Sequence, residues 1–442
     1  MKIIKTATFI KKQINDIKIY GTKEFFRKFY LLIKFFSVVF MDIIAILPCL
    51  IIRLISPLVL IRIQRIPAGN FGDFALHPAM YYCKKKFKID QPTKKHIDLV
   101  YIHYREKLYN KQLEKMWKRK FNFLSGYLLD PINRINRLIP GWEKHIIKSL
   151  HRHQRDVDLL YEKCRPLKFT DEEEVYGNKM LNKFGLKDKD KFVCLAVRDR
   201  AYQQKKIPTT QRDWSYHDYR HTDVYKFYLA AEELTKRGYY VFRMGVCAEK
   251  SFGTNNPKII DYANSNLRSD FMDIYLAAKC YFCVSSSSYG FSDLTNLFAK
   301  PIVNMNLPFG EIATYSEKFL LIVKHHFLKK ENRKLSLTEI FSHGAAWIND
   351  TKVYKQKDIE LIDNSEEEIR DVVVEMIENL EFKKKLDPED EQLQESFKSL
   401  YAKNLKRYEY QNESMKPGEI MHGTIRCRFG SKFLRENKAW LK

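Results

Sequence analysis

The feature that most constrains the fold is a series of short apolar runs that alternate with helical segments between residues 192 and 305. Runs of strand length lie at 192–197, 239–242, 258–260, 281–284 and 302–305, and helices are predicted between them at 222–236, 270–279 and 291–299. Repeated strand–helix units with continuously apolar strands predict a parallel sheet that helices cover on both faces. We therefore expect an α/β fold with a doubly wound parallel sheet.

Polar residues follow the ends of these predicted strands. In an open α/β sheet, ligands bind outside the carboxyl ends of the strands. Guanidinium groups, hydroxyls and free N–H groups at a helix amino terminus are the groups that bind a diphosphate. Each residue alone could equally be a surface ion pair or a solvated turn, but together they favour a nucleotide site. The predicted donor-binding residues are Arg198, Arg243, Gly245, Asp261, Tyr262, Ser286, Ser287, Ser288 and Gly290.

The preceding part of the chain predicts a smaller α/β unit. A strand at 61–66 leads into a loop with Gly69, Asn70, Gly72 and Asp73, then a helix at 74–86 and a strand at 97–102. With 442 residues the chain is too long for one compact core. We expect a membrane-associated segment over 1–60, a smaller α/β domain over 61–168, a Rossmann-like domain with the nucleotide site over 190–350, and a C-terminal helical segment over 351–442 that returns to the first domain.

The amino-terminal 61 residues predict contact with a membrane. Eight Lys/Arg and two acidic residues in 1–28 precede a stretch at 29–61 that is apolar except for Lys34, Asp42 and Arg53. A central Arg costs about 2.5–3.5 kcal/mol on insertion scales, which favours a helix or a broken helical hairpin in the cytoplasmic interface. A true span and a buried core helix are the alternatives. Deletion of residues 1–58 is expected to give a soluble protein.

The charge distribution agrees with a membrane partner. The net charge is 78 − 54 = +24, and residues 1–168 hold 34 Lys/Arg against 13 Asp/Glu, or +21. Positive charge beside the most apolar stretch is typical of a protein at an anionic membrane surface. The sequence has no aromatic–basic RNA motif, so nucleic acid is not an expected partner.

Several signatures of other nucleotide and metal sites are absent from the sequence. It has no G-x-x-x-x-G-K-[ST] and no G-x-G-x-x-G. Asp156 and Asp158 match a D-x-D pattern, but in a helical run they point to different faces, where they cannot share a metal ion. Cys280 and Cys283 form a lone C-x-x-C and are expected to be buried thiols. No metal and no cofactor is expected.

The segments 223–245, 261–278 and Ser285 to Gly290, with the helix and Lys300-Pro301 that follow, resemble a family of bacterial glycosyltransferases of GT-B architecture from surface-polysaccharide biosynthesis. The serine/glycine loop is similar to the donor-binding segment of heptosyltransferases. The resemblance implies two Rossmann-like domains that face a cleft, a nucleotide-diphosphate sugar on the second domain, and a glycan or lipid-linked acceptor on the first. The protein is then expected at the cytoplasmic face of the inner membrane, monotopic or peripheral.

The catalytic residues expected from this assignment are Asp73, His77 and Arg243. Such an enzyme needs no metal when side chains and helix dipoles stabilise the leaving diphosphate, a role for Arg198 and Arg243. Asp73 is the candidate base for the acceptor, and His77 is the alternative candidate. Asp73 could also be only the N-cap of its helix.

Two other classes of function remain open. One keeps the fold and changes the reaction, to a sugar-nucleotide epimerase or a polyol-phosphate transferase. The other is a basic peripheral membrane protein without enzymatic activity, which predicts salt-sensitive polyanion binding without specificity for a nucleotide sugar.

Overall fold

The structure is a computed structural model that describes residues 2–442 except 148–162, 202–213, 247, 249, 288–289, 313–315, 383–386, 405–408, 411–412 and 415–424. Its contacts divide the chain into two compact units. The smaller unit comprises Met1–Ile66, Pro92–Glu106 and Phe121–Lys148, and the larger unit comprises Pro67–Gln91, Lys107–Lys120 and Ser149–Lys442.

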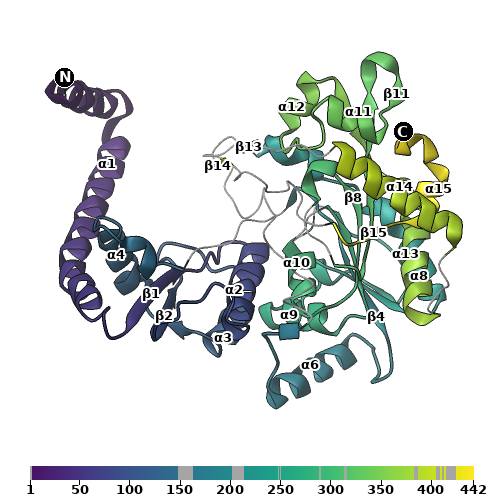
Figure 1. Ribbon diagram of the computed structural model, residues 1–442, viewed down its shortest axis with the longest axis horizontal. Helices are drawn as coiled ribbons and strands as arrows, with labels where there is room; N and C mark the ends of the chain where they lie inside the picture. Colours follow the sequence, from purple (N-terminus) through teal and green to yellow (C-terminus); the bar gives the residue numbers. More distant parts are fainter. Residues whose placement is uncertain are drawn as a thin grey trace. The chain divides into compact units, whose positions relative to one another are not determined.

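The smaller unit begins with a long helix, α1, over Lys2–Leu54 (Figure 1). Gly21, with φ 70° and ψ −157°, interrupts the helical backbone and separates two helical parts. The second part, Gly21–Leu54, has 34 residues and is long and apolar enough to cross a membrane. Pro48 lies inside this helix without ending it. The segment therefore forms one helix, and the hairpin form of the predicted membrane segment is wrong.

After α1 in the chain, three parallel strands form a small sheet in the order β1-β2-β3. Their bounds are Leu60–Arg65, His96–Tyr101 and Asn122–Phe123, and α4 (Gly126–Asn136) and the short helix η1 (Trp142–His145) follow. The core of this unit joins Ala45 and Cys49 of α1 to Ile63, Tyr101, Leu129 and Ile132. The predicted strands at 61–66 and 97–102 are confirmed to within one residue.

Two charged residues of the apolar helix, Asp42 and Arg53, are paired with α4 and the segment that follows it. Arg134 of α4 donates to Asp42 at 2.7 Å, and Arg53 donates to the Asn136 side chain at 2.8 Å. Arg53 also donates to the main-chain oxygens of Ile139 and Pro140. Two of the three charges that weigh against insertion in a bilayer, those of Asp42 and Arg53, are thus satisfied by the protein.

The larger unit is built on a seven-stranded sheet whose strand pairs are all parallel. The order is β15-β9-β8-β7-β4-β5-β6. The bounds are β4 Phe192–Ala196, β5 Tyr240–Arg243, β6 Ile259–Ile260, β7 Cys283–Ser286, β8 Ile302–Leu307, β9 Phe319–Val323 and β15 Arg428–Phe429. The chain leaves β4 toward β5 and β6 and then returns to the other side of β4 at β7. This reversal is the mark of a doubly wound sheet, so the predicted parallel α/β fold is confirmed.

Helices cover both faces of this sheet (Figure 1). On one face, α8 (Tyr228–Lys236) and α13 (Glu366–Glu381) pack on each other and on the strands. On the other face lie α9 (Asp270–Lys279) and α10 (Gly290–Leu297). A capping box begins α13, in which the Ser365 and Glu368 side chains each accept from the other residue's backbone N–H.

The remaining elements extend this unit. Its other helices are α2 Phe71–Lys86, α3 Lys111–Lys118, α6 Asp171–Lys183, α11 Leu337–Ser342, α12 Thr351–Gln356, α14 Pro388–Asn404 and α15 Ser431–Glu436. A second, three-stranded sheet pairs β10 (His325–Leu328) with β11 (Arg333–Lys334) and β12 (Ile359–Ile362), and β13 (Glu409–Tyr410) pairs with β14 (Glu413–Ser414).

The contacts divide the segment 61–168 between the two units, because its strands belong to the smaller and α2 and α3 to the larger. The described residues of 351–442 lie in the larger unit, where β15 extends the sheet and α13 packs on α15. The predicted domain bounds and the return of the chain end to the first domain stay predictions. Cys280 and Cys283 are buried free thiols, as expected.

Candidate functional site

The reversal of strand order places the ends of β4 and β7 side by side. Arg198 lies two residues beyond β4, and Ser286 is the last residue of β7. The main-chain N–H of Arg198 donates to Ser286 Oγ at 2.8 Å. In a doubly wound sheet the ligand crevice opens at this switch point. Two predicted donor-binding residues therefore meet where the fold alone would place a ligand.

The serine segment differs from its prediction. Ser285 and Ser286 pair with Asn304 and Met305 of β8, so they extend β7 where a loop was expected. Ser287 follows with φ 54°, and its N–H donates to Met305 O. The Ser285 and Ser287 hydroxyls are buried, and neither has a hydrogen-bond partner among the described residues. Buried hydroxyls are normally satisfied, so two without partners beside the start of α10 are candidate ligand donors. Ser288 lies outside the described residues.

Arg243 requires a correction. It is the last residue of β5, pairs with Leu195 and is only 1% exposed, so it does not follow the strand into an open crevice. Its guanidinium group lies 3.2 Å from Asp261 Oδ1 and 3.5 Å from Asp199 Oδ2, and it donates to Lys250 O. Arg243 is thus neither a surface ion pair nor an open phosphate ligand. It holds two carboxylates at neighbouring strand ends.

Asp261 and Tyr262 are also engaged inside the protein. Asp261 Oδ2 accepts from Phe252 N–H at 3.0 Å and from the Asn264 side chain at 2.9 Å. Burial raises the pKa of Asp261, but these hydrogen bonds and Arg243 outweigh burial and leave that pKa lowered. Tyr262 is fully buried and donates to Asp273 at 2.9 Å. Gly245 lies two residues beyond β5 and is half-buried.

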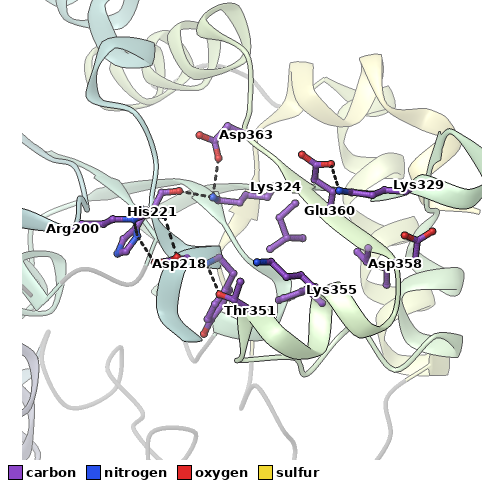
Figure 2. Close-up of a pocket in the computed structure, with 14 residues that line it drawn as sticks. Arg200, Asp218, His221, Lys324, Lys329, Thr351, Lys355, Asp358, Glu360 and Asp363 are labelled. Carbon is purple, nitrogen blue, oxygen red and sulfur yellow. Dashed lines mark hydrogen bonds and ion pairs between the residues drawn. The ribbon is translucent and has the colours of Figure 1, made fainter. Parts of the chain in front are cut away.

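A pocket of about 620 Å³ lies in the same unit (Figure 2). Arg200, His221 and Lys324 line one part of it, and Thr351, Lys355 and the β12 segment line another. Lys324 follows β9 directly, is buried, and contacts His221 O and Asp363 Oδ1 at 2.8 Å each (Figure 2). Thr222 N–H donates to Arg198 O, which joins the His221 segment to the end of β4. The pocket thus adjoins the predicted switch-point residues.

His221 and Lys324 are pocket residues that were not predicted from the sequence. Lys324 follows an apolar run at 319–323, so the strand-end argument could have found it. Nothing in the sequence indicates His221, because it lies on no predicted strand end and the fold alone brings it to the pocket.

Burial and four nearby cations keep His221 unprotonated. Burial lowers its pKa most, Arg198, Arg200, Lys324 and Arg220 lower it further, and the result is about 3. The imidazole is therefore neutral at pH 7. Arg200 Nε donates to Nδ1 at 3.3 Å, which leaves the hydrogen on Nε2, and Nε2 is buried without a partner among the described residues. The pocket lining also holds carboxylates, and Asp218 and Asp363 pair with Arg200 and Lys324. An anion bound here would compete with these carboxylates for the two cations.

The predicted acceptor loop lies at the start of α2. Asn70 is the N-cap, and it exchanges hydrogen bonds with Asp73, through Asn70 Oδ1 at 2.9 Å and Asp73 Oδ2 at 2.7 Å. Asp73 is therefore not the cap itself. His77 Nε2 lies 3.4 Å from Asp73 Oδ1, so the structure brings the two predicted catalytic residues into contact. Gly69 is exposed.

Gly72 and Gly290 have a packing role. A Cβ on Gly290 would lie 2.9 Å from Gly72 N and 3.1 Å from the Phe71 side chain. A Cβ on Gly72 would lie 2.5 Å from Asp293 Oδ2. The two glycines let α2 and α10 touch near their amino termini, which explains why α2 belongs to the larger unit.

Among the described residues, no group of three or more His, Cys, Asp or Glu side chains could hold a metal ion. Asp156 and Asp158, the D-x-D pair of the sequence, lie outside those residues.

Comparison with known proteins adds little. No family model matches the chain, and no curated protein matches it. Among solved structures, the chain is similar to a glycosyl transferase family 9 protein from Veillonella parvula DSM 2008, with a TM-score of 0.40 and 10% sequence identity over 74% of this chain and 98% of that chain. A similarity this low does not assign a function to the chain.

We expect His221 to stay neutral well below pH 6. Its pKa in the folded protein is lower than the ordinary 6.5, so its contribution to stability is complete above pH 6.5 and is lost as the pH falls toward 3. A bound diphosphate offsets the nearby cations and should raise this pKa. NMR titration of the His221 ring with and without pyrophosphate measures both effects. An unchanged pKa with saturating pyrophosphate would place the anion elsewhere.

Proposed function

We propose that the protein is a glycosyltransferase that moves a sugar from a nucleotide-sugar donor to a glycan or lipid-linked acceptor at the cytoplasmic face of the membrane. The observation that carries the proposal is the junction of Arg198 and Ser286 at the switch point of a doubly wound sheet, beside a pocket with Arg200, His221 and Lys324. The two-domain GT-B arrangement, with the smaller unit's sheet on the acceptor side, is part of the proposal.

The chemistry proposed for the site is stabilisation of the leaving nucleoside diphosphate. Negative charge develops on the diphosphate as the glycosidic bond to the sugar breaks. In this proposal Arg198, Arg200 and the Nε2–H of His221 offset that charge, together with the Ser285 and Ser287 hydroxyls. Preorganised donors in a site of low dielectric constant act strongly on developing charge, so no metal is required by this mechanism.

Asp73 remains the proposed base for the acceptor hydroxyl. One carboxylate oxygen contacts His77 and the other accepts from Asn70, and the side chain is 40% exposed. These contacts fix the orientation of the carboxylate, which a general base requires. His77 is proposed to position Asp73.

Membrane association is the second part of the proposal. Large apolar side chains on α1 are exposed along its second part, among them Phe36 at 61% and Leu47 at 66%. Soluble monomers rarely expose a contiguous apolar surface of this extent. A lipid-linked acceptor would be presented to the enzyme at the same membrane.

Calorimetry with UDP, GDP, CDP and ADP, on the full chain in detergent, tests the donor proposal. We expect one nucleoside diphosphate to bind more tightly than the others, with the same affinity in EDTA. Arg200→Ala should weaken that binding about tenfold, since one charge-assisted contact is worth about 1.5–3 kcal/mol. Arg237→Ala, which removes an arginine paired with Glu233 on α8, is the matched control and should bind normally.

The outcomes separate the open alternatives. Equal, weak and salt-sensitive binding of all four nucleotides would favour a non-enzymatic polyanion-binding protein. Specific binding followed by isomerisation of the nucleotide sugar without an acceptor would favour the epimerase. Binding that is lost in EDTA and restored by Mg²⁺ would overturn the metal-independent mechanism.

A further inference from the structure

The orientation of α1 toward a bilayer can be inferred from the way it docks on α4. The contacts with α4 use one face of α1, on which Asp42 pairs with Arg134 and Ala45 and Cys49 are buried. The opposite face at the same level is exposed, with Leu47 at 66% and Leu54 at 80%. The docked part of the helix therefore has a protein face and a bare apolar face.

The same two faces continue along the undocked part of the helix. Successive helical residues are rotated by 100°, so Lys23, Arg27 and Lys34 lie on the same side of α1 as Ala45 and Cys49. Farther along the helix this is the side that α4 covers. Phe29, Phe36 and Phe40 lie on the side of Leu47 and Leu54 and are 50–64% exposed. Leu31 and Phe35, which are 45% and 61% exposed, also lie on the side of Lys34, and Glu24 pairs there with Arg27. The undocked part therefore has a basic edge along that side, and its other sides are apolar.

The docking of α1 on α4 disfavours a membrane span. The hydrocarbon core is about 30 Å thick and needs about 20 residues of helix. Every 20-residue window of Gly21–Leu54 contains at least two charged residues. The windows poorest in charge contain Asp42, whose carboxylate is held by Arg134 of the sheet-bearing unit. Insertion of such a window would break this ion pair or carry α4 and the strands behind it into the hydrocarbon, where open sheet edges are not tolerated.

We propose that α1 lies in the plane of one leaflet, with the Phe29, Phe36, Phe40 and Leu47 face in the acyl chains and the Lys23, Arg27 and Lys34 face among anionic headgroups. The partner is thus the surface of an anionic bilayer, because a basic edge beside an apolar face binds both parts of the lipid. This inference rests on the membrane part of the proposed function. It adds that the N-terminal part of α1 stays on the same side of the bilayer as the two units.

Cysteine labelling on preformed phosphatidylglycerol/phosphatidylethanolamine vesicles tests the orientation. Phe36→Cys and Lys34→Cys are two residues apart on opposite faces, and Thr6→Cys reports the N-terminal part. The described native cysteines are buried. With a membrane-impermeant maleimide added outside, we expect Lys34→Cys and Thr6→Cys to react and Phe36→Cys to be protected at least tenfold. All three should react in detergent with denaturant.

Each other outcome overturns the proposal in a distinguishable way. Protection of Lys34→Cys and Phe36→Cys together, with Thr6→Cys reactive only after detergent, would show a span and leave the membrane function intact. Full reactivity of Phe36→Cys with vesicles present would show that the membrane part of the proposed function fails. Protection of Phe36→Cys without vesicles, dependent on protein concentration, would show that a second copy of the chain covers this face. Nucleotide calorimetry is unaffected by any of these results.

Discussion

Arg243→Ala is expected to lower the free energy of unfolding of the larger unit by about 3 kcal/mol. Removing one partner of a buried ion pair leaves an uncompensated charge, which typically costs about 3–5 kcal/mol. Arg243 has two carboxylate partners, and both Asp199 and Asp261 keep some contact with solvent, so the lower end of that range applies. Urea unfolding monitored by circular dichroism measures the change.

Two variants make this prediction specific. Arg237→Ala removes an exposed ion pair with Glu233 and should cost no more than about 0.5 kcal/mol. Adding Asp261→Asn to Arg243→Ala should recover part of the loss, because one of the uncompensated charges is then gone. Arg243→Lys should also be destabilised, since lysine cannot reach both carboxylates and Lys250 O together. A fully stable Arg243→Ala that has lost only nucleotide binding would restore the direct phosphate role predicted from the sequence.

Deletion of residues 1–40 is expected to release the protein from membranes and leave it folded. The deletion removes Phe29, Phe36 and Phe40, whose burial in lipid is worth about 1.5–3 kcal/mol each, so vesicle affinity should fall at least a thousandfold. The part of α1 that packs on α4 remains, including Asp42 and Arg53. Vesicle flotation measures the first effect and thermal unfolding the second.

Deletion of residues 1–58, the cut that the sequence suggests, should behave differently. It also uncovers Leu129 and Ile132 of α4 and removes Asp42 from Arg134 and Arg53 from Asn136. We expect this protein to aggregate or to melt at a clearly lower temperature than the shorter deletion. Equal melting temperatures for the two would show that the packing of α1 on α4 contributes nothing to the smaller unit. Flotation of the shorter deletion with vesicles, as for the full chain, would place the membrane contact elsewhere.

The sequence by itself determined the parallel sheet and most of its elements. Short apolar runs, helix caps such as Ser365 and turn residues such as Gly238 act within a few neighbours, so their effect can be predicted locally. It also placed Arg198 and Ser286 at strand ends, and parallel strands bring their carboxyl ends to one edge of a sheet whatever the details of packing.

Only the tertiary structure decided how these residues are used. Arg243 was predicted to bind phosphate, but in the folded chain it is buried and pairs with Asp199 and Asp261 at the ends of the strands beside β5. His221 and Lys324 lie 103 positions apart in the sequence and meet in one pocket wall, which no local pattern encodes. Gly72 and Gly290 lie where α2 and α10 contact each other. Burial and pairing depend on which distant segments pack together, and that is a property of the whole fold.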